Sequence, residues 1–121
     1  MILVDTSVWI DHLRVGDVGL VALLDRALVL THPLVVGELA CANLRNRVEV
    51  ASLLQDLPHA PVARDAELLF FIEQHRLMGL GIGYIDVHLL AATTLADPAL
   101  LWTRDQRLAA VARSLSLKFE E

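Results

Sequence analysis

Four acidic residues stand at positions where carboxylates could do chemistry. They are Asp5, Glu38, Asp86 and Asp105. Asp5 ends the short apolar run Ile2 to Val4, which we expect to be a buried strand, and Asp105 follows a similar run, Leu100 to Trp102. Ligands of open α/β sheets bind at the carboxyl ends of parallel strands. These two acids are therefore expected at the edge of a sheet where a ligand would lie.

The other two acids interrupt helical stretches that are otherwise apolar. Glu38 is the only charge between Pro33 and Ala42, and the stretch from Leu77 to Ala92 contains only Asp86 and His88 besides apolar residues, Gly and Tyr. Burying a lone carboxylate is costly unless it is paired or binds a cation, and Asp is a poor helix former. If these acids are buried, each requires a partner, which the sequence alone does not identify.

Each acid also has a purely structural interpretation. Asp5 and Asp105 could cap the helices that follow them, as Asp often does. Glu38 could lie on a narrow exposed stripe or pair with Arg45, and Asp86 could be satisfied by an arginine or by Tyr84. The functional interpretation rests on the four acids converging in space.

If the four carboxylates share one cleft, their chemistry is narrowly defined. Like charges at close range raise one another's pKa values unless a cation is present. Hard oxygen ligands select Mg²⁺ or Mn²⁺. Two such ions, roughly 3.5–4 Å apart, suit phosphodiester hydrolysis, in which one ion activates a water and the other stabilises the leaving oxygen.

The elements that must position these acids alternate between short apolar strands and helices. This alternation predicts an α/β fold with a parallel sheet and helices on both faces. We expect strands at residues 2–4, 27–30, 59–62 and 100–102, with an edge strand at 117–119. We expect helices at residues 6–14, 18–26, 33–46, 48–57, 64–78, 84–95 and 105–114.

The composition limits the class of protein. The 121 residues, 55% hydrophobic and 21% charged, suit a single globular domain spanning residues 1–121. No apolar run reaches the roughly 18 residues of a membrane span, and we see no signal peptide. The single cysteine, Cys41, is expected to be a buried thiol, and together these features suggest the cytoplasm. The net charge of −5 argues against nucleic-acid binding by bulk electrostatics, but allows a local basic rim.

Four stretches, taken in order and spacing, carry a further signal. They are Leu3–Ile10, Val36–Leu39, Gly83–Ala91 and Leu101–Asp105. Together they resemble the PIN-domain ribonucleases, and in particular the VapC toxins of bacterial toxin–antitoxin pairs. Each stretch alone is weakly specific, whereas the combination covers essentially the whole chain.

The resemblance implies a fold and a site. The fold is a three-layer α/β/α sandwich around a parallel sheet of four to five strands. The activity is that of an endoribonuclease dependent on Mg²⁺ or Mn²⁺, with all four acids as catalytic residues. Asp5 and Asp86 are the expected direct metal ligands, and Glu38 and Asp105 would bind the metal directly or through waters.

The resemblance also implies supporting residues and partners. Thr6 and Thr103 match positions at which the family often carries a hydroxyl that supports the metal ligands. The substrate would be RNA, and the protein would be a homodimer inhibited by a small VapB-type antitoxin whose tail enters the acidic groove. Arg104 and Arg107 flank the last acid, where they could contact RNA phosphates or simply be exposed helix charges.

Two other classes of function compete with a nuclease. A catalytically silent interaction module would keep the fold and bind a partner, although four retained acids argue against lost activity. A receiver-like phosphoacceptor domain would have similar length and architecture. However, Asp5 has no acidic neighbour, and Lys118, the only lysine, comes too late in the chain to be followed by a last helix.

Overall fold

The structure, a computed structural model, describes residues 1–121 and contains three strands and seven helices. The strands are β1 (Ile2–Val4), β2 (Val29–Leu30) and β3 (Leu100–Trp102). The helices are α1 (Thr6–Val15), α2 (Val18–Asp25), α3 (Pro33–Cys41), α4 (Arg47–Gln55), α5 (Asp65–His75), α6 (Tyr84–Leu95) and α7 (Gln106–Ser114).

The three strands form one parallel sheet in the order β2-β1-β3. In the central strand, Ile2 pairs with Val29 on one side and with Leu100 on the other, and Val4 pairs with Trp102. The carboxyl ends of β1 and β3 therefore meet, although the two strands are separated by most of the chain.

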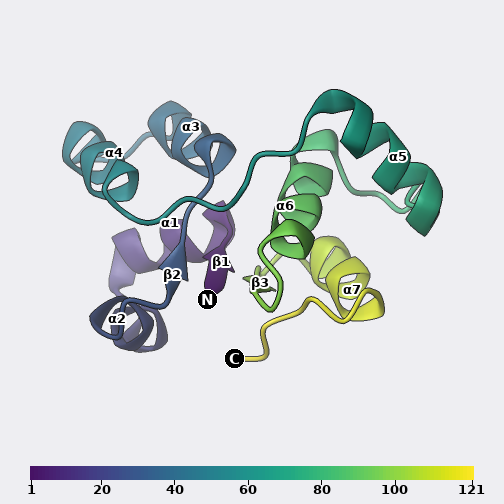
Figure 1. Cartoon of the computed structure of the whole chain (residues 1–121). Helices are drawn as coiled ribbons and strands as arrows, with labels where there is room; N and C mark the ends of the chain where they lie inside the picture. The colour runs from purple at the N-terminus through teal and green to yellow at the C-terminus, as the bar shows by residue number, and fades with distance from the viewer.

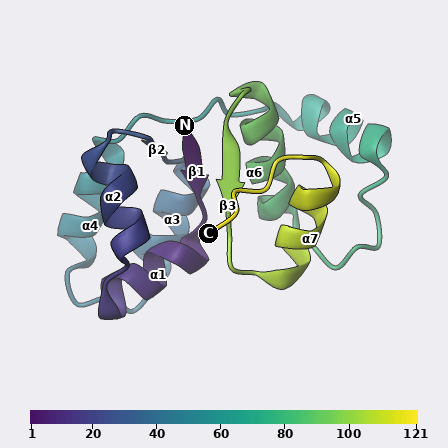
Figure 2. The ribbon, with the colours of Figure 1, turned by 90° about the horizontal axis from the view of Figure 1, so that it is seen from below.

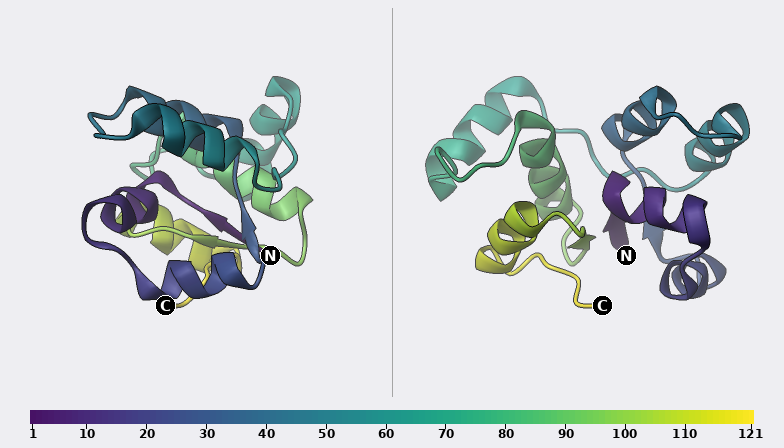
Figure 3. Two further views of the ribbon diagram at one scale, coloured as in Figure 1. Left: turned by 90° about the vertical axis from the view of Figure 1, so that its left-hand side faces the viewer. Right: turned by 180° about the vertical axis from the view of Figure 1, so that it is seen from behind.

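Helices lie on both sides of these strands. Helices α1 to α4 lie on one side and α5 to α7 on the other, and views from the front, from below and from behind agree on this arrangement (Figures 1, 2 and 3). The α/β class and the parallel sheet are thus confirmed. No helix is long and apolar enough to cross a membrane.

The predicted number of strands, four to five, is wrong, because the sheet has three. The two missing strands are reduced to isolated parallel bridges, Thr31 with His59 and Leu101 with Lys118. Pro61 follows the first bridge closely and has no N–H to continue a ladder. Ser116, with a φ of 60°, turns the chain just before the second.

Several element boundaries also differ from the predicted ones for local reasons. The second strand begins at Val29 because Ala27 has a φ of 56°, outside the extended region. Helix α5 ends at His75 because Arg76 adopts a left-handed conformation. Helix α3 ends at Cys41 rather than at residue 46, and this cysteine is exposed, so the predicted buried thiol is wrong.

The core fixes the strand ends that carry the acids. It contains 26 buried hydrophobic residues, of which Leu3, Val4 and Leu101 in the sheet are fully buried. Leu89 and Leu90 of α6 are equally buried against it. Each acid on these elements is therefore attached to a well-packed backbone.

Candidate active site

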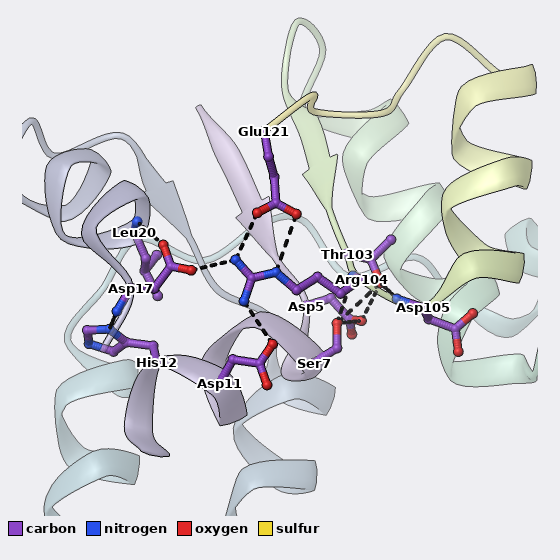
Figure 4. Close-up of polar contacts among 10 residues, drawn as sticks. All are labelled: Asp5, Ser7, Asp11, His12, Asp17, Leu20, Thr103, Arg104, Asp105 and Glu121. Carbon is purple, nitrogen blue, oxygen red and sulfur yellow. Dashed lines mark hydrogen bonds and ion pairs between the residues drawn. The ribbon is translucent and has the colours of Figure 1, made fainter. Parts of the chain in front are cut away.

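Asp5 lies directly after β1 and is only 7% exposed. It occupies the N-cap position of α1, yet its carboxylate makes no capping hydrogen bond. Instead, its Oδ2 accepts hydrogen bonds from Oγ of Ser7 at 2.9 Å and from Oγ1 of Thr103 at 2.7 Å (Figure 4). The capping interpretation is therefore wrong for Asp5, whose carboxylate is held by two hydroxyls.

Asp105 lies in the turn after β3, and here the capping interpretation is right. Its Oδ1 accepts a hydrogen bond of 2.9 Å from the backbone N–H of Leu108 in the first turn of α7. The N–H of Asp105 donates to Oγ1 of Thr103 at 3.1 Å, so the same threonine contacts both strand-end acids. The turns after β1 and β3 are thus hydrogen-bonded to each other at the point where the two acids emerge.

Asp86 is the third residue of α6, not a mid-helix residue as the sequence suggested. Its Oδ2 accepts a hydrogen bond of 3.0 Å from the N–H of Gly83, which stabilises the first helical turn. An acid in this turn is favoured, so poor helix propensity is not an argument for function here. The argument for a functional role of Asp86 is therefore electrostatic. Partial burial raises the pKa of Asp86, and the negative charges of Asp5 and Asp105 raise it further.

Glu38 reaches from α3 to the first residue of α1. Its Oε1 accepts a hydrogen bond of 2.7 Å from Oγ1 of Thr6, the residue that follows Asp5. The glutamate is half-buried and forms no ion pair with Arg45 or with any other basic side chain. Both threonines singled out from the sequence, Thr6 and Thr103, therefore hydrogen-bond to carboxylates of the predicted site.

The four acids share one electrostatic feature, which is that none of them pairs with a basic side chain. The nearby negative charges act on Asp86 without a protein cation to offset them. A hard divalent cation matches this donor set chemically. No three acidic, histidine or cysteine side chains form a ready-made cage, but Mg²⁺ keeps several waters and is usually bound by only one or two carboxylates.

An open depression lies between α1, α3 and the start of α6, and Glu38 is the one of the four acids that lines it. Glu38 and Thr6 line it together with Cys41, and Ile85 contributes an apolar wall. The depression gives a ligand direct access to the Glu38 side of the acidic cluster.

Sequence reasoning missed Ser7 as part of this arrangement. Its hydroxyl donates to Asp5 and accepts the backbone N–H of Arg104 at 3.0 Å. The only signal in the sequence is its place two residues after the acid, and Ser at that spacing is common. Tertiary pairing of β1 with β3 is what gives the residue its role.

The two arginines that flank Asp105 have different environments. Arg104 forms ion pairs with Asp11, Asp17 and Glu121 (Figure 4), so its guanidinium is not free for a phosphate. Arg107 is exposed, lies against Gly81 and forms no ion pair. The hypothesis of a phosphate contact therefore applies to Arg107 and not to Arg104.

Comparison with known proteins identifies the family. Residues 2–114 match the PIN domain family. The chain is also 44% identical over 121 residues to "Ribonuclease VapC32" of Mycobacterium tuberculosis, in strain CDC 1551 / Oshkosh and in strain ATCC 25618 / H37Rv. The alignment covers all of this chain and 98% of each relative.

The chain therefore belongs to the PIN-domain family, as its four sequence stretches indicated. Within that family, its similarity along the full length is to a VapC ribonuclease.

Proposed function

We infer that the protein is a VapC-type toxin, a ribonuclease that hydrolyses RNA phosphodiester bonds at its acidic site with a Mg²⁺ or Mn²⁺ ion. The family supports the reaction class, because PIN nucleases are typically metal-dependent. The observation that carries the assignment to this site is the set of four carboxylates without a single basic partner, centred on the buried Asp5.

Asp5 and Asp86 are the proposed direct ligands of the ion, and Glu38 and Asp105 bind it directly or through waters. When bound, the ion lowers the pKa of an attacking water and stabilises negative charge on the phosphate. The hydroxyls of Ser7 and Thr103 hold one oxygen of Asp5 in a fixed orientation. Oriented ligands of this kind are typical of metal sites, where hydrogen-bonded neighbours tune affinity.

The wider assembly follows from the family in the same way. We propose that residues 1–121 form one nuclease domain of the PIN type, in which the helices on both sides of the sheet form the outer layers of an α/β/α sandwich. We further propose that it acts as a homodimer and is inhibited by a VapB-type antitoxin. RNA would approach along the depression beside Glu38, which is open to solvent.

A cleavage assay with purified, antitoxin-free protein and structured RNAs tests the proposal. Reactions contain Mg²⁺, Mn²⁺ or EDTA, and Asp5→Asn and Asp86→Asn are compared with the wild type. We expect cleavage only with a divalent ion. In either variant the cleavage rate should fall at least about a hundredfold, which is the typical effect of removing one group that stabilises charge in the transition state.

Asp25→Asn provides the matched control, because Asp25 is exposed at the end of α2 and forms no ion pair. It should cleave like the wild type. Wild-type cleavage by both active-site variants would refute the nuclease site. Absence of Mn²⁺ binding to the wild type in a titration would favour the alternative of a silent interaction module.

A further inference from the structure

The side chain of Arg104 is the centre of an ion-pair cluster beside the acidic site. Nη1 donates to Asp11 of α1 at 2.8 Å, and Nη2 donates to Asp17, the N-cap of α2. Glu121 accepts from both Nη2, at 2.8 Å, and Nε, at 3.3 Å. The guanidinium also lies 5.4 Å from the centre of the Trp102 ring. One side chain of the turn after β3 thus contacts two acids within residues 11–17 and a third at Glu121.

The charge of this cluster argues against a role in attracting RNA. One guanidinium faces three carboxylates, so the cluster carries two net negative charges. Hydrogen bonds from Arg104 lower the pKa of Asp17 and that of Glu121. Phosphate binding depends on uncompensated positive charge, and Arg104 offers none.

The backbone of the same residue belongs to the acidic site. The N–H of Arg104 donates to Oγ of Ser7, whose hydroxyl donates to Asp5. The preceding residue, Thr103, donates to Asp5, and the following residue, Asp105, is one of the four acids. The guanidinium extends to one side of this turn and the carboxylate of Asp105 to the other (Figure 4). The ion-pair cluster of Arg104 and the acidic site are therefore both attached to one three-residue turn, residues 103–105.

From this juxtaposition we propose that Arg104 is a positioning residue, which clamps the turn of residues 103–105 to α1, to Asp17 and to Glu121, and so sets the affinity of the acidic site for its divalent ion. The inference rests on the proposed function, because it concerns the affinity of the proposed metal site for a divalent ion. The arginine fork is essential to the clamp, since a lysine ammonium is a point charge that cannot reproduce the bidentate contact with Glu121.

The test measures Mn²⁺ binding by calorimetry on the full chain, without RNA, for wild type, Arg104→Lys and Glu121→Gln. Loss of residues that orient metal ligands typically reduces metal affinity about 10–100-fold. We expect a loss of that size in Arg104→Lys and a smaller loss in Glu121→Gln. Amide hydrogen exchange at Arg104 should become faster in both, because the bond to Ser7 loosens.

Glu120→Gln is the matched control. It removes the same charge one position away, and Glu120 pairs with Lys118 and Arg113 but not with Arg104. Its Mn²⁺ affinity and exchange rates should equal those of the wild type. Glu121 is half exposed, so Glu121→Gln keeps the test valid even if Arg104→Lys does not fold.

Binding of a non-cleaved RNA in EDTA separates positioning from direct contact. A positioning role leaves RNA affinity in Arg104→Lys unchanged, and Glu121→Gln should match Glu120→Gln. Tighter RNA binding by Glu121→Gln than by Glu120→Gln would mean that a released Arg104 contacts phosphate, and would overturn the inference. So would wild-type Mn²⁺ affinity in both Arg104→Lys and Glu121→Gln. A wild type that neither binds Mn²⁺ nor cleaves RNA would instead refute the proposed function, which is a distinguishable failure.

Discussion

Oγ1 of Thr103 donates a hydrogen bond of 2.7 Å to Oδ2 of Asp5, and this buried contact joins two residues that are 98 positions apart. It connects the carboxyl ends of β1 and β3 at the point where both strands deliver an acid. Since Thr103 also accepts the backbone N–H of Asp105, one hydroxyl contacts the carboxylate of Asp5 and the backbone of the turn that carries Asp105.

Thr103→Val should lower both stability and metal affinity. The substitution keeps the shape of the side chain but leaves Oδ2 of the buried Asp5 with one donor fewer. Removing one partner of a buried hydrogen bond costs about 1–3 kcal/mol. Urea unfolding measures the loss of stability, and a Mn²⁺ titration measures the loss of affinity.

Thr94→Val is the control for this prediction, because the hydroxyl of Thr94 bonds only to a carbonyl of its own helix, that of Leu90. Its Mn²⁺ affinity should stay at the wild-type value. Equal Mn²⁺ affinities for Thr103→Val and the wild type would show that the hydroxyl does not support the metal site.

His32 makes the fold sensitive to acid. This histidine is fully buried as the N-cap of α3, where its Nδ1 accepts the N–H of Leu34. Burial is the largest cause that lowers the pKa of His32, and the proximity of His88 and His59 adds to it, so that the pKa falls to about 4. The unfolded chain therefore binds this proton more tightly than the folded protein does, so the contribution of His32 to stability is complete above its unfolded pKa of 6.5 and is lost as the pH falls toward 4.

The size of this loss is about 3 kcal/mol if the folded pKa is near 4. His32→Asn should remove that slope while keeping a residue that can cap the helix, even if the smaller side chain lowers stability at every pH. Urea unfolding between pH 7 and pH 4 measures the slope, with His75→Asn at an exposed position as the control. An unchanged slope in His32→Asn would assign the acid sensitivity to other groups.

Arg107→Gln should weaken RNA binding without changing Mn²⁺ affinity. Arg107 is exposed and unpaired two residues after Asp105, so it is free to contact a phosphate. Losing one phosphate contact reduces the slope of log K against log salt by about 0.7 for a single strand. Filter binding of a non-cleaved RNA at several salt concentrations gives this slope.

Arg113→Gln, which alters an exposed residue of the same helix, controls for the change in net charge. An Arg107 variant whose salt slope matches that of Arg113→Gln would exclude the phosphate contact.

Cys41 should react with thiol reagents in the folded protein, because it is exposed at the end of α3. It lines the same depression as Glu38 and Thr6. A bulky maleimide adduct should therefore block access of RNA and reduce cleavage, whereas Cys41→Ser should cleave normally with or without reagent. Mass spectrometry measures labelling, and slow labelling that requires denaturant would contradict the exposed position.

The sequence was sufficient to place the four acids on their elements. Asp5 and Asp105 follow buried strands, and Glu38 and Asp86 lie on helices, as predicted. Short apolar runs such as Ile2–Val4 and Leu100–Trp102 are strong local signals of strands, because a parallel strand is buried on both faces. Helix α6 was predicted with its observed bounds, since the glycines before it and the Asp-Pro turn after it delimit the helix.

The strand count and the role of Arg104 could not be predicted in the same way. The residues near His59 and Lys118 could form strands only if a neighbouring strand offered enough backbone groups for pairing. In the structure, His59 and Lys118 each form a single bridge. The partners of Arg104 lie between 17 and 93 residues away. No local pattern distinguishes this arginine from Arg107, and only the tertiary arrangement shows that one is enclosed by carboxylates and the other is free.

The pairing of β1 with β3 has a consequence for folding during synthesis. The first strand is complete at Val4, but its partner is complete only at Trp102. During synthesis on the ribosome, Asp5 therefore emerges long before Thr103 and Asp105 exist to hold and complete its surroundings. A chain that ends before β3 lacks both Asp105 and the Thr103 hydroxyl that holds Asp5, so the complete set of four acids exists only late in synthesis.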